Sequence, residues 1–138
     1  MRYGTRGVSV IAATSGLTLA VILTAGAALS AHHSFAAFNM QGEKAISGTV
    51  KQFDWTNPHT WIWVNVPDGQ GGVETWAIEG MSPNFLGRRG WTKSTLKAGD
   101  KISVVIRPMR DGSKGGMFVR ATLADGKVLL QTGDPTEP

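Results

Sequence analysis

The amino-acid sequence predicts a small all-β barrel behind an N-terminal signal peptide. Segments that alternate apolar and polar residues are separated by short turns rich in Gly, Asn, Asp and Pro, and one helical segment interrupts the series. At 138 residues the chain has room for one domain of this kind. It contains no cysteine, so the domain must be stabilised by its core rather than by disulfides.

The strand segments follow one another along most of the chain. We expect them at residues 46–55, 59–66, 73–79, 101–108 and 115–123, with a short last one at 125–130. In HTWIWVNV the alternation is strict, so that Ile62 and Val64 face one side of the strand while Trp61 and Trp63 face the other.

The segment 82–90 has the start and stop signals of a short helix. Ser82 can cap it, Pro83 suits the first helical position, and Gly90 can end it. A helix between the third and fourth of five or six strands is the order of an OB-like barrel. An immunoglobulin-like sandwich is the alternative, but it requires about seven strands and no such helix. The residues expected to fill the core are Ile46, Val50, Ile62, Val64, Val66, Ile78, Leu86, Ile102, Val104, Ile106, Val119 and Leu123.

The N-terminal segment has the pattern of a signal peptide. Arg2 and Arg6 precede an uncharged, mostly apolar run that ends in small residues. An uncleaved membrane anchor is the alternative, because a run of this length can cross a bilayer, but its repeated Gly, Ser and Thr make a poor membrane helix. We therefore expect cleavage after Ser30 or Ala31 and no membrane span afterwards. The resulting division is 1–31 signal peptide, 32–130 barrel domain and 131–138 polar tail.

The charge of the chain argues against nucleic-acid binding. Two of its fourteen basic residues, Arg2 and Arg6, lie ahead of the apolar run, which leaves a net charge of +2 instead of +4. A protein that binds phosphates needs clustered cations. We therefore expect no nucleic-acid partner.

Two loops of the predicted barrel carry candidate binding residues. OB-like barrels bind ligands through the loops that join strands 1–2 and 4–5 and across the adjoining face. These regions hold a set of aromatic and cationic side chains that suits a small anionic or aromatic ligand. The alternative is ordinary packing, in which Phe35, Phe38 and the C-terminal strand cover the tryptophans. The candidate ligand or partner residues are Trp55, Trp61, Trp63, Arg107, Arg110 and Lys114.

The three histidines are candidate metal ligands. Cleavage in the predicted region places His32 and His33 at or next to the new N-terminus, where an α-amine and imidazole nitrogens can surround Cu(II). His59, in the strand 1–2 loop, can add a third imidazole. The alternative is that the pair is only a spacer, since the termini of mature proteins are usually mobile. Copper is thus a candidate ligand, while the apolar core predicts that no cofactor is required for folding.

No catalytic motif is recognisable. A nucleophilic serine requires a base oriented by a carboxylate, and the sequence has neither that context nor a metalloprotease or phosphate-binding motif. Glu79 is an isolated acid at the end of an apolar strand. A general acid is one interpretation, but a pair with Arg88 or Arg89, or with the N-terminal amides of the helix, explains it more simply. We therefore expect a protein that is not an enzyme.

Several blocks of the sequence are distinctive: AHHSFAAF, GTVKQFDWTNPHTWIWV, ETWAIEGMSPNFLGRRGW, LKAGDKISVVIRPMRDGSKGG and ATLADGKVL. Together they resemble a family of small exported proteobacterial proteins classed only as a domain of unknown function. F-x-W-T-N-P-H and P-x-x-x-G-x-x-G-G are the most specific motifs. The resemblance implies a periplasmic location and brings no established activity or ligand. The family has Asp after the AAF block, whereas this chain has Asn39.

Two functions remain. The first is an exported, non-enzymatic binding module that holds Cu(II) or a small ligand. The second is an interaction module that docks an envelope protein through the face of Trp61 and Trp63. An exposed apolar patch around these tryptophans favours docking, whereas a convergent histidine cluster favours metal.

Overall fold

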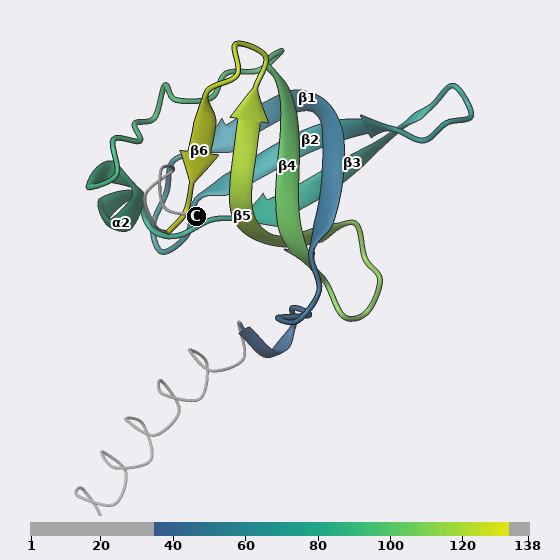
Figure 1. Cartoon of the computed structure of the whole chain (residues 1–138), viewed down its shortest axis with the longest axis horizontal. Helices are drawn as coiled ribbons and strands as arrows, with labels where there is room; N and C mark the ends of the chain where they lie inside the picture. Colours follow the sequence, from purple (N-terminus) through teal and green to yellow (C-terminus); the bar gives the residue numbers. More distant parts are fainter. Residues whose placement is uncertain (1–34, 133–138) are drawn as a thin grey trace, which may run out of the picture. The chain divides into compact units, whose positions relative to one another are not determined.

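The computed structural model of the chain describes residues 35–132. Its strands and its helix lie in a compact unit that begins at Ala37, and Figure 1 shows their arrangement. The predicted signal peptide, its cleavage site, His32 and His33 lie outside the described residues. In chain order the elements are β1 (Lys44–Asp54), β2 (Trp61–Pro67), β3 (Val73–Glu79), α2 (Pro83–Gly87), β4 (Lys101–Pro108), β5 (Gly115–Leu123) and β6 (Val128–Leu130).

The strands form one sheet that closes on itself. Its order is β3-β2-β1-β4-β5-β6, and β3 also pairs with β5. This additional pairing is parallel and joins residues 77–79 to residues 115–117. The result is a closed barrel of five strands with β6 added beside β5, and α2 connects β3 to β4. The predicted all-β, OB-like architecture is therefore confirmed.

Strand β1 serves two neighbours, which is how the sheet bends into a barrel. Residues 44–49 pair with β4 and residues 49–54 pair with β2, with Lys51 as an extra, bulged residue. Bulges increase the local twist of a strand. Gly48 lies near the change of partner, where an added Cβ would come within 2.3 Å of the Asn65 carbonyl oxygen. A side chain at this position is excluded by the close approach of the two strands.

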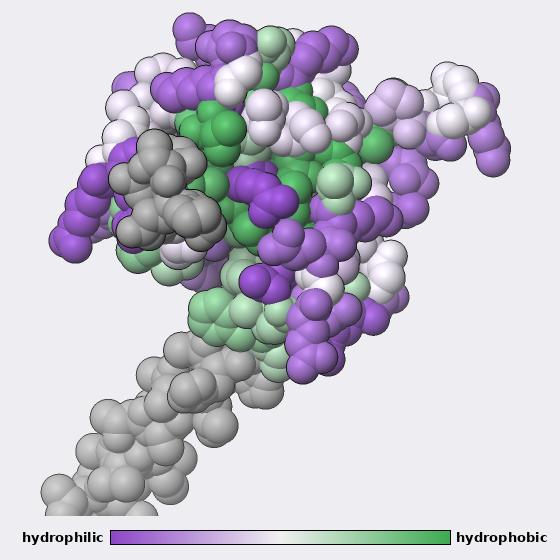
Figure 2. All heavy atoms as spheres, viewed as in Figure 1, coloured by the Kyte–Doolittle hydropathy of each residue, from purple (hydrophilic) through white to green (hydrophobic). Residues whose placement is uncertain are grey.

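The barrel is filled by the inward side chains of the strands. Most of the predicted core residues are buried, and Val64, Ile78, Val104 and Ile106 are 0% exposed. Val66 and Leu123 are partly buried against this core. On the face shown in Figure 2, hydrophobic residues lie over the region of β4 to β6 with a strongly hydrophilic group among them, and hydrophilic residues predominate toward the periphery.

Val119 is the one predicted core residue whose placement needs correction. The register of β4 and β5 passes from Arg120 opposite Val105 to Phe118 opposite Ile106, so that Val119 is an extra, bulged residue. A bulge changes the phase of the inward–outward alternation. Phe118 therefore fills the core, with 1% exposure, and Val119 is only half-buried.

Helix α2 is shorter than predicted but begins as expected. The Ser82 hydroxyl accepts a hydrogen bond from the Phe85 amide (3.3 Å), and Pro83 occupies the first turn. The helix ends at Gly87 with Arg88 as its C-cap, and Gly90 adopts a positive φ of 81° that turns the chain. The chain after this turn returns toward the barrel.

The segment after α2 and the C-terminal end complete the core. Trp91 and Leu96 are buried, and the Trp91 indole donates to the Leu130 carbonyl (3.2 Å). Gln131, which the sequence assigned to the polar tail, is 6% exposed and accepts a hydrogen bond from the Met81 amide (3.1 Å). The folded domain therefore includes Gln131. In the part of the chain that the structure describes, no helix has the length and apolar character needed to span a membrane.

Candidate functional site

The outward face of β2 carries two tryptophans at its N-terminal end. Ile62 and Val64 are buried inside the barrel, so Trp61 and Trp63 project from the opposite side and are half-buried. Their rings are stacked, with centroids 6.1 Å apart and an angle of 27° between the planes. The alternation predicted for this strand is confirmed, and it presents an indole pair on the outside of the barrel.

Two carboxylates flank Trp61 across the sheet. Asp54 of β1 is its register partner on one side and Glu79 of β3 on the other. Side chains directly opposite in antiparallel strands have Cβ atoms about 5 Å apart. Asp54 also accepts a hydrogen bond from the Trp63 indole nitrogen (2.8 Å), which orients that ring. We refer to Asp54, Trp61, Trp63 and Glu79 as the aromatic–acidic surface.

His59 borders this surface through Glu79. Its Nδ1 contacts Glu79 Oε1, and the side chains of the two residues are 38% and 15% exposed. With Nδ1–H donated to the carboxylate, Nε2 is left for another partner. Glu79 was expected to pair with Arg88 or Arg89, but the ion pair found for it among the described residues is with His59. Arg89 instead donates to the Phe85 carbonyl and stacks on the Phe85 ring.

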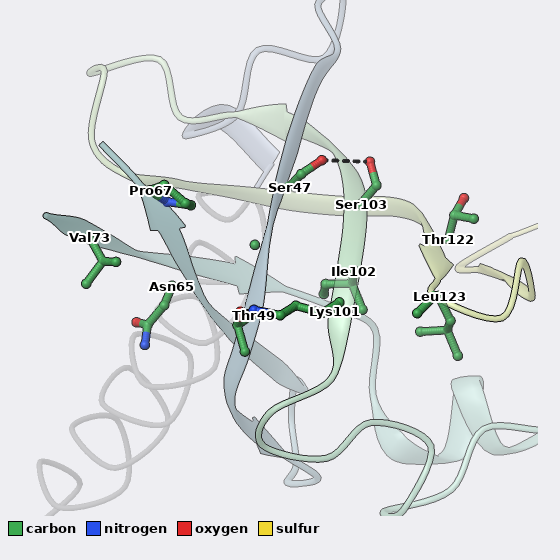
Figure 3. Close-up of a pocket in the computed structure, with 12 residues that line it drawn as sticks. Ser47, Thr49, Asn65, Pro67, Val73, Lys101, Ile102, Ser103, Thr122 and Leu123 are labelled. Carbon is green, nitrogen blue, oxygen red and sulfur yellow. Dashed lines mark hydrogen bonds between the residues drawn. The ribbon is translucent and has the colours of Figure 1, made fainter. Parts of the chain in front are cut away.

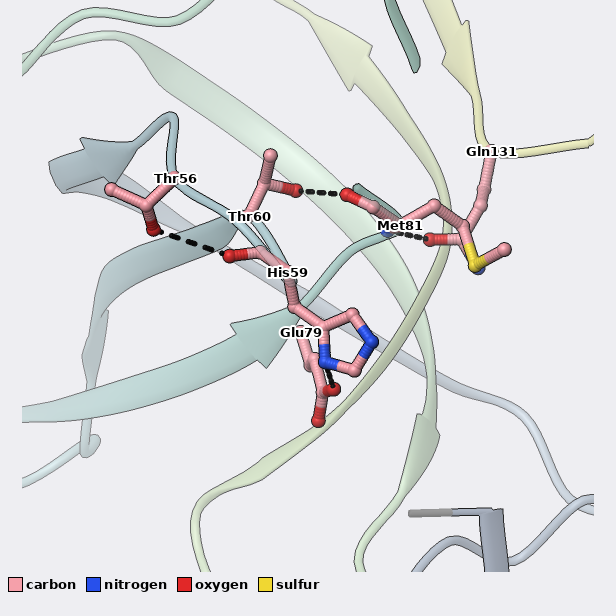
Figure 4. Close-up of polar contacts among 6 residues, drawn as sticks. All are labelled: Thr56, His59, Thr60, Glu79, Met81 and Gln131. Carbon is pink, nitrogen blue, oxygen red and sulfur yellow. Dashed lines mark hydrogen bonds and ion pairs between the residues drawn. The ribbon is translucent and has the colours of Figure 1, made fainter. Parts of the chain in front are cut away.

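A set of hydrogen bonds holds His59 beside Glu79 (Figure 4). The Gly80 amide donates to the Thr60 carbonyl (2.9 Å), and the Thr60 hydroxyl donates to the Met81 carbonyl (3.0 Å). The Met81 amide in turn donates to the buried Gln131 side chain (3.1 Å). These bonds tie the residues before β2 to those after β3, which fixes both ends of the histidine–glutamate contact.

The predicted cations have polar partners elsewhere in the domain. The Arg107 guanidinium donates to the Met40 carbonyl, and Arg110 Nε donates to the Phe38 carbonyl (2.9 Å). The Lys114 ammonium lies 3.0 Å from the Glu74 carboxylate. The structure thus brings His59, Trp61 and Trp63 together, while the polar contacts of Arg107, Arg110 and Lys114 serve the segment before β1 and the start of β3.

Trp55 belongs to the packing of the barrel. It meets Phe53 edge to face, with ring centroids 5.7 Å apart, and packs against the core cluster. Phe38 and the last strand were expected to cover the tryptophans, but both have other partners. Phe38 is buried and forms a bridge with Met109, and β6 pairs with β5. Phe35 is 52% exposed.

The other end of the outward β2 face borders a groove (Figure 3). Its volume is about 800 Å³, and β1, β4 and β5 line it together with the two strands of the β2–β3 hairpin. Polar groups of its wall pair with one another: Ser47 donates to Ser103 (3.2 Å) and Lys101 donates to Thr49 (2.6 Å). Val73 is 65% exposed at its edge. The groove offers apolar contact area but carries none of the candidate metal, ligand or partner residues named from the sequence.

The described residues do not contain a complete metal site. Within residues 35–132, no group of three or more His, Cys, Asp or Glu side chains could hold a metal ion. His59 and Glu79 supply two donors, and His32 and His33 lie outside the described residues.

Sequence reasoning missed Asp54 and considered Glu79 only as an isolated acid, so it did not place either carboxylate beside Trp61. Their placement beside Trp61 depends on the registers β1–β2 and β2–β3, which join residues distant along the chain. One signal in the sequence pointed to the β1–β2 register. The TNPH connection between these strands is short, and a tight turn restricts which residues can lie opposite one another.

Comparisons with known proteins identify a family but not an activity. One solved structure with similarity is the mitochondrial single-stranded DNA-binding protein Rim1 from S. cerevisiae, at 13% identity and a TM-score of 0.44, over 60% of this chain and 94% of that chain. No curated protein matches the chain. The family model described as "Family of unknown function (DUF6152)" matches residues 20–119. The chain therefore belongs to the DUF6152 family.

Proposed function

We propose that the chain is an exported, non-enzymatic module that docks a partner protein of the cell envelope through the aromatic–acidic surface. The observation that carries this proposal is the stacked, half-buried Trp61–Trp63 pair on the outside of the barrel. Tryptophan is enriched among the residues that dominate binding energy at protein interfaces. An exposed apolar patch with polar groups around it is typical of an interaction site.

The setting of the tryptophan pair supports docking energetically. Both rings stand on a strand in the middle of a three-stranded part of the sheet, and the Trp63 indole is hydrogen-bonded to Asp54. Side chains already held in one orientation lose little conformational entropy on binding. A rigid aromatic pair is therefore a better anchor than the same residues on a loop.

The same region supports binding rather than catalysis. A histidine–carboxylate pair acts in nucleophilic catalysis when a hydroxyl or thiol meets the free imidazole nitrogen. The neighbouring hydroxyls have other acceptors: Thr56 donates to the His59 carbonyl (3.3 Å) and Thr60 to the Met81 carbonyl (3.0 Å). We therefore propose no reaction at His59.

Cu(II) binding is a second candidate function, favoured by the contact between His59 and Glu79. Imidazoles that bind metals usually donate their other ring N–H to a carboxylate or carbonyl, which fixes the tautomer. In this proposal the mature N-terminus supplies the main ligands through its α-amine and His32 or His33, and His59 adds an imidazole. Cu(II) heads the divalent affinity order for such nitrogen donors.

Site-specific photo-crosslinking in cells of the native organism tests docking. A photoreactive residue replaces Thr75, which is exposed two residues from Ala77, the register partner of Trp63. Lys93, exposed in the loop after α2, takes the same residue as a control. Docking predicts a discrete crosslinked species from position 75 that is lost in W61A/W63A. The absence of such a species, or its persistence in the double variant, would contradict the proposal.

Titration of Cu(II) into protein with its processed N-terminus, followed by EPR, tests the second candidate. One extra N-terminal residue should weaken nitrogen ligation sharply, and H59A should weaken it less. Copper is excluded as a ligand of this segment if the extended protein and H32A/H33A both bind as wild type does.

A further inference from the structure

The two carboxylates of the aromatic–acidic surface have no Lys or Arg partner within the described residues. Asp54 accepts hydrogen bonds from the neutral donors Trp63 and Gln52. Glu79 contacts His59, whereas the lysine and arginine ion pairs of this part of the chain involve other carboxylates. A neutral donor leaves the charge of a carboxylate in place. Asp54 therefore keeps an uncompensated negative charge beside the indole pair, and Glu79 adds a second one when the His59 imidazole is neutral.

Other aromatic rings of the domain are covered by the chain's own cations. The Lys44 ammonium lies 4.7 Å from the Trp76 ring centroid, and the Arg89 guanidinium carbon lies 3.9 Å from the centroid of Phe85. In the described part of the chain, no lysine or arginine lies over the Trp61–Trp63 pair. The aromatic rings with a carboxylate on either side are thus left without a cation.

We propose that the aromatic–acidic surface binds an arginine side chain presented by the partner protein, an inference that rests on the docking function proposed above. The ring face of an indole attracts a cation, and a guanidinium adds planar stacking. Its forked N–H groups donate to carboxylates in paired fashion. Asp54 and Glu79 lie on opposite sides of Trp61, about 10 Å apart at Cβ, so one carboxylate can receive the paired donors while the other adds electrostatic attraction.

The shape of the surface favours a protein as the source of the arginine. Sites for small molecules are concave and enclose most of their ligand. The indole pair instead lies on the outer face of a closed barrel, on strand β2, which has β1 on one side and β3 on the other. Such a face meets another protein surface, and the charge complementarity selects a basic residue at the centre of the contact.

Peptide binding to the full-length, ¹⁵N-labelled protein tests the arginine site. The probes are an acetylated Gly-Arg-Gly-Arg-Gly amide and the same peptide with citrulline, which keeps the shape of arginine without its charge. The indole N–H signals of Trp61 and Trp63 are followed by NMR. We expect the arginine peptide to shift both signals saturably and the citrulline peptide to bind about fivefold more weakly. Added salt should reduce the difference.

Charge-neutralising variants locate the interaction. D54N and E79Q keep the size of each side chain and an acceptor oxygen, so each should weaken the arginine peptide about threefold and the pair about tenfold. E74Q is the matched control, because it makes the same change on the same strand at a carboxylate that pairs with Lys114. It should bind the peptide like wild type. Thermal unfolding of each variant establishes that the fold is retained.

The proposal is overturned if the arginine peptide gives no saturable shift, if the citrulline peptide binds equally well, or if D54N/E79Q binds like wild type. If a crosslink from position 75 is nevertheless found and depends on the tryptophans, the docking proposal stands and the partner binds through apolar contact alone. Conversely, arginine binding that depends on both carboxylates, without any crosslinked species, supports the arginine site and contradicts envelope docking.

Discussion

Replacing Gly80 with alanine tests how the end of β3 is held against the start of β2. A Cβ added to Gly80 would come within 2.4 Å of the Thr60 hydroxyl oxygen, while the next nearest atoms, on Gln131 and Leu86, are 3.8 Å away. The steric conflict of G80A is therefore with one atom. Overpacking of this kind typically costs 1–3 kcal/mol, so we expect G80A to lower the free energy of unfolding by about 2 kcal/mol.

The partner substitution decides whether this explanation is right. T60A deletes the conflicting oxygen and loses the hydrogen bond to Met81 (3.0 Å), worth about 1 kcal/mol. In the T60A background, G80A should cost less than about 0.5 kcal/mol, because alanine also reduces the entropy of the unfolded chain. T60V loses the same hydrogen bond but puts a methyl group at the oxygen's place. In that background G80A should still cost about 2 kcal/mol.

Urea unfolding followed by tryptophan fluorescence and circular dichroism measures all six proteins of the two cycles. We expect a coupling energy of about 1.5 kcal/mol between G80A and T60A, and about zero between G80A and T60V. Equal costs of G80A in the two backgrounds would refute the steric role assigned to Gly80. The same spectra report whether the sheet around His59 and Glu79 remains folded.

Three further predictions concern the core, a loop and cofactors. F118A should destabilise the domain by about 3–5 kcal/mol in urea unfolding and V119A by less than about 1.5 kcal/mol; similar costs would contradict the bulge in β5. Hydrogen bonds from Ser113 lower the pKa of Asp111, so S113A should raise that pKa in an NMR titration. S113A should be less stable than wild type above about pH 4. This difference should vanish as the pH falls below the pKa of Asp111 in the unfolded state and then below its lower pKa in the folded state. An unchanged Asp111 titration would show that the Ser113 hydroxyl does not lower this pKa. EDTA should leave the far-UV circular dichroism unchanged, and a loss of the β signal would instead make metal part of the fold.

Local patterns in the sequence were sufficient to predict the barrel. The alternation around Ile62 and Val64 and the cap at Ser82 each depend on neighbouring residues, and both are confirmed. The position of Val119 could not be predicted, because a bulge arises from pairing between β4 and β5 and leaves no local signal. Trp91 enters the core from an irregular segment without hydrophobic periodicity.

The candidate site was predictable only in part, for a similar reason. The outward position of Trp61 and Trp63 follows from alternation within one strand. Their carboxylate neighbours follow from two registers that depend on turn geometry and barrel closure. The cations were expected beside the tryptophans because their loop is near in OB-like topology, but side-chain partners such as the Met40 carbonyl for Arg107 are set by the segment before β1.

Hydroxyl-radical footprinting of the tryptophans tests the docking surface most directly. The oxidation of Trp61 and Trp63 is measured by mass spectrometry in the purified protein and in intact cells of the native organism, and is expressed relative to Met40, which is 38% exposed. Buried Trp91 provides the lower limit of reactivity (4% exposed). Docking predicts that Trp61 and Trp63 are oxidised in the purified protein and protected several-fold in cells, while Met40 is oxidised in both. Equal relative oxidation of Trp61 and Trp63 in the two samples would contradict a docked partner on this surface.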